Sequence, residues 1–394
     1  MRRLAAPLML LALLGAAEPP LRTVPPVSIL ATDAEARWVP FDLTEGNQIR
    51  FTMTVDGHPA TAILDTGVSY SVMSRRYAAA TGERIVEHGT ADAIGGAVPL
   101  AWAATRKLVL GGVTRTGGRI AVVELPAIAT GESMPVDLLV GRDLIGRYAL
   151  DIDYDAHRFR LLASGRLPFT GVTAPLAISA TRQVYESEVT LGGRRIRPMI
   201  VDTGDGSSIT FSADAWKGLA AADRTMTTAI SFGLGGPIVT DLAVVPQLRL
   251  GQLTAPDVEV RVERGGGFSQ GVGAAGRIGA SFLQRYRVLL DPGAGRMVLA
   301  PGRTATAPPL KSTSGLLVRA DGRRLDVLHV MRGSPAAATG WQGGEAICSI
   351  DGKAIPQDYR RSAIASWSVG QPGRIVALGL CNGDTRDLTL ASFY

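Results

Sequence analysis

The sequence predicts an all-β protein with two similar lobes and a third, smaller β-rich module at the C-terminal end. An apolar run that ends in Asp-Thr-Gly occurs at residues 62–67 and again at residues 199–204. Each copy follows a strand, a short glycine turn and a second strand, and similar apolar segments come after both copies in the same order. A repeat of this kind indicates two copies of one structural unit. A stretch rich in Pro, Thr and Ala at residues 301–314 predicts a linker before the third module.

The N-terminal residues predict export. Residues 1–17 contain two arginines, a short apolar run and small residues at the end, which is typical of a signal peptide. The alternative is a buried N-terminal helix, because the apolar run is too short to span a bilayer. Residues 18–45 contain two Pro-Pro pairs and are expected to form an extended leader. We therefore expect a periplasmic or secreted protein with no stable membrane span.

The composition argues for a globular protein and against a nucleic-acid partner. The chain has 394 residues, which is long enough for the cores of two or three domains. Of these residues 46% are hydrophobic and 19% are charged, as in a globular protein. Its formal net charge is +6, but the basic residues are scattered and form no Lys/Arg-rich surface motif.

Metal and cofactor chemistry has no support in the sequence. The four histidines are widely separated: His58, His88, His157 and His329. Neither Cys348 nor Cys381 has the spacing of a metal ligand, although an exported protein would allow the two to pair. A glycine pattern at residues 271–276 matches the dinucleotide fingerprint by letter, but no parallel βαβ unit surrounds it. We predict no metal and no cofactor.

The first lobe is expected to span residues 46–165. Alternating apolar residues predict strands at 48–55 and 58–64, followed by a short helix at 74–80. A hairpin with Ile94-Gly95-Gly96 at its tip comes next. The remaining expected elements are strands near 108–110 and 120–123, a short helix at 142–147, and two strands within 148–162.

The second lobe is expected to span residues 166–300 and to repeat this order. Strands are predicted at 188–191 and 196–201, with a helix at 213–220. Leu234-Gly235-Gly236 forms the tip of the corresponding hairpin. A short helix ending near Arg285 and strands within 286–299 complete the repeat.

The repeated triplets predict a pair of carboxylates, Asp65 and Asp202. Two carboxylates held close together share one proton, so the pair can act as general acid and general base. Gly67 and Gly204 would allow each loop to turn tightly and bring its amide toward the carboxylate. Thr66 and Thr203 have hydroxyls that could join the two loops. The alternative, that each triplet only makes a turn after a strand, explains one copy better than two.

At these residues the chain resembles the aspartic proteases. Residues 139–144, Leu-Val-Gly-Arg-Asp-Leu, are similar to the family's apolar-apolar-Gly signature in its retroviral form. Ile94-Gly95-Gly96 and Leu234-Gly235-Gly236 resemble substrate-binding flaps. The resemblance covers residues 46–300 and implies a pseudo-symmetric pair of lobes fused in one chain. It also implies one catalytic aspartate from each lobe and a cleft for a polypeptide between them.

Three residues depart from the family pattern. Val68 and Asp205 follow the two glycines where the family usually has Ala, Ser or Thr, and Arg277 stands where the signature requires an apolar residue. A hydroxyl at the first position would lower the pKa of the neighbouring carboxyl, and Asp205 should raise the pKa values of the pair by repulsion. We therefore expect an activity optimum at weakly acidic to neutral pH.

Residues 315–394 resemble a bacterial PDZ domain. The resemblance rests on residues 315–318 and on the Gly- and Ala-rich segment from 330 to 352. It implies a groove helix at 358–366 and a final hairpin at 375–390. It also places the amides of Leu316 and Leu317 where a peptide C-terminus would bind. The alternative is a purely structural cap.

Together these features predict an exported aspartic endopeptidase, a hydrolase whose Asp65 and Asp202 activate a water and whose PDZ-like module recruits or positions a protein substrate. The alternative is a catalytically silent adaptor that keeps the protease fold and binds peptides.

Overall fold

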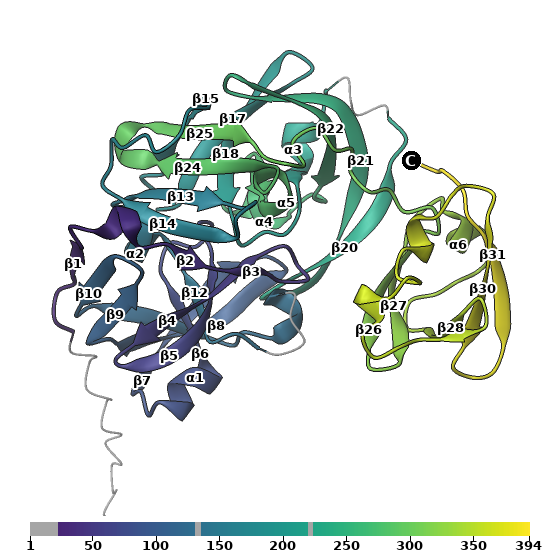
Figure 1. Cartoon of the computed structure of the whole chain (residues 1–394), viewed down its shortest axis with the longest axis horizontal. Coiled ribbons are helices and arrows are strands. Elements are labelled where there is room, and N and C mark those ends of the chain that lie inside the picture. The colour runs from purple at the N-terminus through teal and green to yellow at the C-terminus, as the bar shows by residue number, and fades with distance from the viewer. Residues whose placement is uncertain (1–22, 131–134, 220–223) are drawn as a thin grey trace, which may run out of the picture.

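The computed structural model describes residues 23–130, 135–219 and 224–394 of the chain. Figure 1 shows two β-rich lobes in contact and a C-terminal module to one side of them. The described elements are mostly strands with a few short helices, so the all-β prediction is confirmed. Residues 1–17, the expected signal peptide, lie outside the described part of the chain.

The first lobe is built on one large sheet. Its strands are β1 (Val27–Leu30), β3 (Asp42–Leu43), β4 (Ile49–Val55), β5 (His58–Leu64), β6 (Val72–Ser74), β7 (Ile85–Ala93), β8 (Gly96–Ala104), β9 (Lys107–Leu110), β10 (Val113–Thr116), β11 (Arg119–Val123) and β12 (Leu138–Val140). They lie in the order β1-β10-β9-β4-β5-β12-β6-β11-β8-β7, with β3 beside β4. The short helices are α1 (Arg75–Ala80), α2 (Arg142–Ile145), η1 (Ala34–Ala36) and η2 (Ala127–Thr130).

Local sequence explains the hairpin that leads to Asp65. Burial alternates along most of β4, so one face of this strand packs into the core. Asp56 and Gly57 form the two-residue turn between β4 and β5, with φ angles of 51° and 91°. Two-residue hairpin turns of type I′ require a positive φ at both positions. The last residues of β5, Ala62 to Leu64, are fully buried, which brings the end of the strand into the centre of the molecule.

The second lobe repeats this arrangement in a sheet with the order β16-β17-β18-β23-β19-β22-β21-β20. Its strands are β16 (Ala177–Ile178), β17 (Tyr185–Leu191), β18 (Arg194–Asp202), β19 (Ile209–Phe211), β20 (Thr227–Gly233), β21 (Gly236–Leu250), β22 (Leu253–Val262) and β23 (Gly276–Gly279). Its helices are α3 (Ala213–Trp216), α4 (Phe268–Gly271) and α5 (Ala280–Leu283). The helix expected over 213–220 is therefore shorter in the described residues.

A third sheet joins the two lobes. It contains β2 (Val39–Pro40), β13 (Ala149–Asp153), β14 (Arg158–Leu162), β15 (Val172–Pro175), β24 (Tyr286–Asp291) and β25 (Arg296–Pro301), and the turn η4 (Pro292–Ala294) joins β24 to β25. β13 pairs with β24, so the closing hairpins of the two lobes share one sheet. Asp151 is fully buried there and accepts hydrogen bonds from Arg160 and Arg287, both at 2.9 Å. One apolar core runs through both lobes.

The C-terminal module has its own sheet and core. The sheet contains β26 (Leu316–Asp321), β27 (Arg324–Val330), β28 (Ala346–Ile350), β29 (Lys353–Ala354), β30 (Ile375–Leu380) and β31 (Thr385–Thr389), with α6 (Pro335–Ala338) beside it. Its core is separate from that of the lobes and includes Leu325, Ile347 and Trp367. A disulfide joins Cys348 to Cys381. Among the described residues, no helix has the length and apolar character needed to cross a membrane.

The groove helix expected at residues 358–366 is wrong. The chain there forms two 3-10 turns, η5 (Tyr359–Arg361) and η6 (Trp367–Val369). The indole of Trp367 donates a hydrogen bond to the hydroxyl of Tyr359 at 2.9 Å, and both side chains are buried. Residues eight apart in an α-helix are separated by about 12 Å along its axis. The two turns fold the segment back on itself, and this brings the side chains of Tyr359 and Trp367 into contact.

Candidate active site

Asp65 and Asp202 lie at the ends of the central strands of the two lobes. In the first lobe β12 runs parallel to β5, and the amide of Asp65 donates to the carbonyl of Val140 at 3.0 Å. In the second lobe β23 runs parallel to β18 and pairs Val201 with Ile278. The structure brings the two aspartates together from opposite lobes, with only 8% and 6% of their surfaces exposed. The pair is therefore almost completely removed from solvent.

The glycine of each triplet lies against the carboxyl group of the opposite lobe's aspartate. A Cβ atom on Gly67 would lie 2.4 Å from Cγ of Asp202. In the same way, a Cβ atom on Gly204 would lie 2.3 Å from Cγ of Asp65. Both distances are far inside van der Waals contact, so only glycine fits at either position. Each glycine thus presses its backbone against the carboxylate of the opposite lobe.

Thr66 and Thr203 join the two loops by four buried hydrogen bonds. The hydroxyl of Thr66 donates to the carbonyl of Val201 at 2.6 Å and accepts from the amide of Thr203 at 3.0 Å. The hydroxyl of Thr203 donates to the carbonyl of Leu64 at 2.7 Å and accepts from the amide of Thr66 at 3.1 Å. Both threonines are fully buried. Because each hydroxyl bonds to the residue before the other lobe's aspartate, this contact fixes the spacing of the pair.

The two carboxyls have different surroundings. Oδ1 of Asp65 accepts the amide of Gly67 at 3.0 Å, whereas Oδ1 of Asp202 accepts the amides of Gly204 and Asp205, both at 3.0 Å. Burial, and then the charge of Asp202, raise the pKa of Asp65 well above its ordinary value. Burial, and then the charge of Asp205, raise the pKa of Asp202 to about 6, while Arg277 and the two amides oppose this rise. Because Asp202 accepts one more amide hydrogen bond than Asp65, its charged form is the better stabilised of the two.

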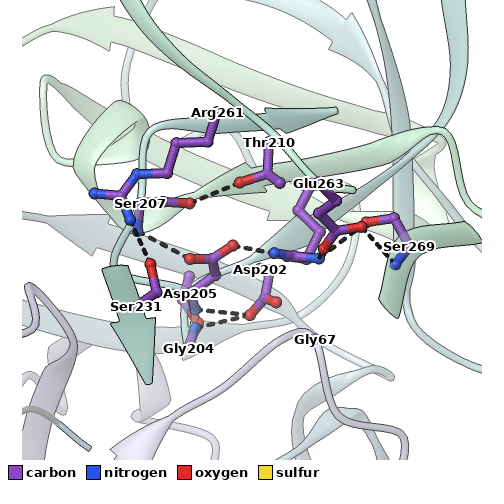
Figure 2. A network of polar contacts seen from close by, with 12 residues as sticks. Gly67, Asp202, Gly204, Asp205, Ser207, Thr210, Ser231, Arg261, Glu263 and Ser269 are labelled. Carbon is purple, nitrogen blue, oxygen red and sulfur yellow. Dashed lines mark hydrogen bonds and ion pairs between the residues drawn. The ribbon is translucent and has the colours of Figure 1, made fainter. Parts of the chain in front are cut away.

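The departures at positions 205 and 277 form one buried ion-pair network, shown in Figure 2 around Asp202. Nε of Arg277 donates to Asp205 at 2.7 Å, and its Nη1 donates to Glu263 at 2.6 Å and to Ser269 at 2.9 Å. The Arg277 side chain is 3% exposed and that of Glu263 is 4% exposed. Burial raises the pKa of Asp205, but the charge of Arg277 and its hydrogen bond outweigh this effect and keep it below the ordinary value. Asp205 is therefore a charged neighbour of the pair.

The first lobe supports its own loop with a different ion pair. Asp143, in α2, accepts hydrogen bonds from the amide and the hydroxyl of Ser71, both at 2.7 Å. Arg115 donates to the same carboxylate at 2.6 Å, and the two side chains are 4% and 11% exposed. The hydroxyl of Ser71 also accepts the amide of Gly141 at 3.1 Å. These contacts tie the segment after Asp65 to the strand end at Val140.

Two segments of the chain, residues 51–144 and 187–282, match the family model described as aspartyl protease. The two matches are consistent with two lobes of the aspartyl protease kind. Each matched segment contains one Asp-Thr-Gly triplet and the parallel strand beside it. No curated protein matches this chain. The matches support a hydrolase of the aspartyl protease kind.

The predicted flaps of the two repeats meet above the cleft. The hairpins β7–β8 and β20–β21 have Ile94-Gly95 and Leu234-Gly235 as their turns. The amide of Gly235 donates to the carbonyl of Ile94 at 2.9 Å. A Cβ atom on Gly95 would lie 2.5 Å from the carbonyl oxygen of Gly236, so the tips cross with no room for side chains. Gly96 lies beside this crossing, 3.7 Å from Gly235 by the same measure.

A cavity of about 740 Å³ lies beneath these flaps and contains the aspartate pair. Its walls include Asp65, Asp202, Ile94 and Leu234, so both repeats contribute to it. Leu234 also packs against an apolar cluster of the first repeat that includes Trp102. In residues 23–130, 135–219 and 224–394, no group of three or more His, Cys, Asp or Glu side chains could hold a metal ion.

Sequence reasoning missed two polar residues that precede β4 and support the second triplet. The side chain of Gln48 donates to the carbonyl of Gly204 at 2.7 Å. The side chain of Asn47 donates to Ser281 at 2.9 Å, and Ser281 in turn donates to the carbonyl of Gly206 at 2.6 Å. Polar residues at the start of a core strand are only a weak sign of a contact with the loop that contains the second triplet. The opposite charges of Asp205 and Arg277, both unusual and both in the second repeat, were a stronger signal for the missed ion pair.

The predicted peptide-binding residues of the C-terminal module are already engaged. Leu316 is 2% exposed, and its amide donates to the hydroxyl of Ser314 at 3.1 Å. Leu317 is half-buried against an apolar cluster that includes Ala229 and Leu242 of the second repeat. The structure thus places Leu316 in the core of the module and Leu317 at its contact with the flap hairpin β20–β21.

Proposed function

We propose that this protein is an exported aspartic endopeptidase whose substrate is a polypeptide. The observation that carries the proposal is the pair of buried carboxyls, Asp65 and Asp202, each held against the glycine of the opposite triplet. The family matches over both repeats support the same reaction class. The crossed flaps above the pair are suited to covering an extended chain.

The asymmetry of the pair supports a division of roles. Asp202 accepts two amide hydrogen bonds and has the lower pKa, so it is the charged member and would act as the general base for a water. Asp65 keeps its proton to higher pH and would donate it to the carbonyl oxygen of the scissile peptide bond. Attack of the water on the carbonyl carbon gives a tetrahedral intermediate. Asp202 then gives the proton that it took from the water to the departing nitrogen, and Asp65 takes a proton back from a hydroxyl of the intermediate, so the C–N bond breaks and the two peptide products leave.

Export is supported by the N-terminal sequence and by the C-terminal disulfide. Residues 1–17 have the pattern of a signal peptide. The disulfide between Cys348 and Cys381 is stable in an oxidising compartment such as the periplasm or the extracellular space. Within this proposal, the PDZ-like module recruits or positions the protein substrate.

The test is hydrolysis of a peptide library by the mature chain and by the variants Asp65→Asn and Asp202→Asn. We expect each variant to fold and to lose hydrolysis, because one carboxylate cannot serve as both acid and base. A pepstatin-type inhibitor should block the wild-type reaction. A folded wild-type chain that binds the inhibitor but cleaves no peptide would instead support the silent adaptor.

A further inference from the structure

The C-terminal module contributes to the cavity that contains the aspartate pair. Val318 on β26 and Leu328 on β27 line the same cavity as Asp65 and Asp202, and Arg319 and Arg360 line it with them. Val318 and Leu328 are half-buried apolar side chains. Arg319 is ion-paired with Asp326. The walls of the cleft therefore come from three parts of the chain: the two repeats and the module.

The module also holds the flap hairpin of the second repeat. Thr228 on β20 and His329 on β27 are hydrogen-bonded through Oγ1 and Nε2 at 2.8 Å. The hydroxyl of Thr227 donates to the carbonyl of Arg332 at 2.8 Å, and the guanidinium of Arg332 pairs with Asp241 on β21 at 3.0 Å. Both strands of the hairpin are thus bonded to one segment of the module.

An apolar contact reinforces these bonds. Met331 is 2% exposed and packs with Ala229 on β20 and Leu242 on β21. Leu317 lies against the same cluster. Burial of a methionine at such a contact removes apolar surface from water and so favours a fixed position for the hairpin.

A second contact joins the module to the opposite side of the cleft. Arg360 forms an ion pair with Glu45, in the segment that precedes β4. Three residues further on, Gln48 donates to the carbonyl of Gly204 beside the aspartate pair. The module therefore contacts both the flap and the segment that supports the second triplet.

We propose that the C-terminal module completes the substrate cleft: it fixes the β20–β21 flap through His329 and Thr228, and its Val318 and Leu328 form an apolar subsite for a substrate side chain. This inference rests on the proposed endopeptidase activity. The expected occupant of the subsite is an apolar residue of the bound polypeptide, because the two wall residues are aliphatic. His329 is a positioning residue, since it acts through the flap.

The test uses the mature full-length chain and a short quenched fluorescent peptide. A short peptide cannot reach both the aspartate pair and a remote recruitment groove, so its kinetics report on the cleft itself. We expect His329→Ala to raise KM about fivefold or more with kcat within about twofold, because a loose flap weakens binding. His329→Gln, which can still bond to Thr228, should restore KM. Lys353→Ala, at an exposed residue of β29 outside the cavity, is the matched control and should leave both constants unchanged.

The subsite has its own readout. Val318→Asp should shift the cleavage preference of a peptide library from apolar toward basic residues at one position near the scissile bond. Lys353→Ala should leave the preference unchanged. An unaltered preference in Val318→Asp would overturn the subsite. Unaltered KM in His329→Ala, with normal cleavage of short peptides, would overturn the role in fixing the flap and favour recruitment at a distance.

Amide hydrogen exchange separates this inference from the endopeptidase activity. We expect faster exchange in β20 for His329→Ala than for wild type, and recovery in His329→Gln. This result does not require hydrolysis. If the wild-type chain is inactive, the proposed function fails. The inference is then still tested by the rate of amide hydrogen exchange in β20 and by the affinity for a pepstatin-type peptide. Equal exchange and equal affinity in His329→Ala and wild type would overturn it.

Discussion

Nε of Arg277 donates a hydrogen bond to Oδ2 of Asp205 at 2.7 Å, and both side chains are buried beside the aspartate pair. Each residue alone departs from the aspartic protease pattern that the chain resembles. Together they bring opposite charges to one place, and Glu263 supplies a second carboxylate to the same guanidinium. Because Asp205 raises the pKa of Asp202 and Arg277 lowers it, this ion pair tunes the base of the proposed reaction.

Arg277→Met should destabilise the protein strongly. Asp205 and Glu263 would remain buried without their cation, which typically costs about 3–5 kcal/mol. Denaturant unfolding measures the loss. Adding Asp205→Asn and Glu263→Gln to the same chain should recover part of it. Arg303→Met, at an exposed ion pair with Asp155, is the control and should cost less than about 1 kcal/mol. Equal stability of Arg277→Met and wild type would contradict the importance of the network.

Thr66→Val should separate the two triplets. Valine cannot donate to the carbonyl of Val201 or accept from the amide of Thr203, and both partners are buried. Leaving such groups unsatisfied costs about 1–3 kcal/mol each. Thr66→Ser keeps the hydroxyl and should lose much less stability. Melting temperatures and peptide hydrolysis of the two variants measure the difference, and similar values for Val and Ser would refute this role of the hydroxyl.

Gly67→Ala should abolish most activity. The new Cβ atom would fall 2.4 Å from Cγ of Asp202, so the two carboxyls must move apart. A misplacement of about 1 Å in a catalytic site can cost about a hundredfold in rate. Gly265→Ala, where a Cβ atom would meet nothing within 4 Å, is the matched control and should keep normal activity. Normal kcat/KM in Gly67→Ala would show that the spacing of the pair is not critical.

Activity should fall on the acid side of about pH 6. The proposed base, Asp202, has a pKa raised to about 6 and must be charged, while Asp65 must keep its proton. The profile of kcat/KM should therefore rise with pH through about 6 and decline only where Asp65 ionises. Arg277 lowers the pKa of Asp202, so a folded Arg277 variant should move the acid limb to higher pH. A wild-type optimum near pH 3 would contradict this assignment.

Asp202→Asn should stabilise the protein more at pH 8 than at pH 5. The folded pKa of Asp202 is raised from the ordinary value of 3.8 to about 6, so the folded state binds its proton more tightly than the unfolded state. The stability from this proton is complete below pH 3.8 and is lost as the pH rises through about 6. Asparagine carries no charge and avoids that loss. Melting curves at both pH values test the sign, and a larger gain at pH 5 would reverse it.

Local patterns predicted much of the fold. Alternation of apolar residues and the Asp56-Gly57 turn are local features, and the observed hairpin from Ile49 to Leu64 lies within one residue of the expected strands. The helix expected at 358–366 is wrong because packing inside the module, and not the local apolar pattern, sets the backbone of this segment. A buried hydrogen bond between Trp367 and Tyr359 folds that segment back, and the sequence pattern contains no sign of this contact.

By itself, the sequence determined that the chain has two similar β-rich lobes and that Asp65 and Asp202 occupy equivalent places in them. Repetition and strand patterning are written in neighbouring residues, so they can be read without coordinates. The tertiary structure alone decided which charges pair and what the C-terminal module contacts. Asp205 meets Arg277 across 72 positions, and Thr228 meets His329 across 101 positions. Contacts over such separations depend on how every intervening strand packs, because burial and hydrogen bonding of the whole chain place the two partners together.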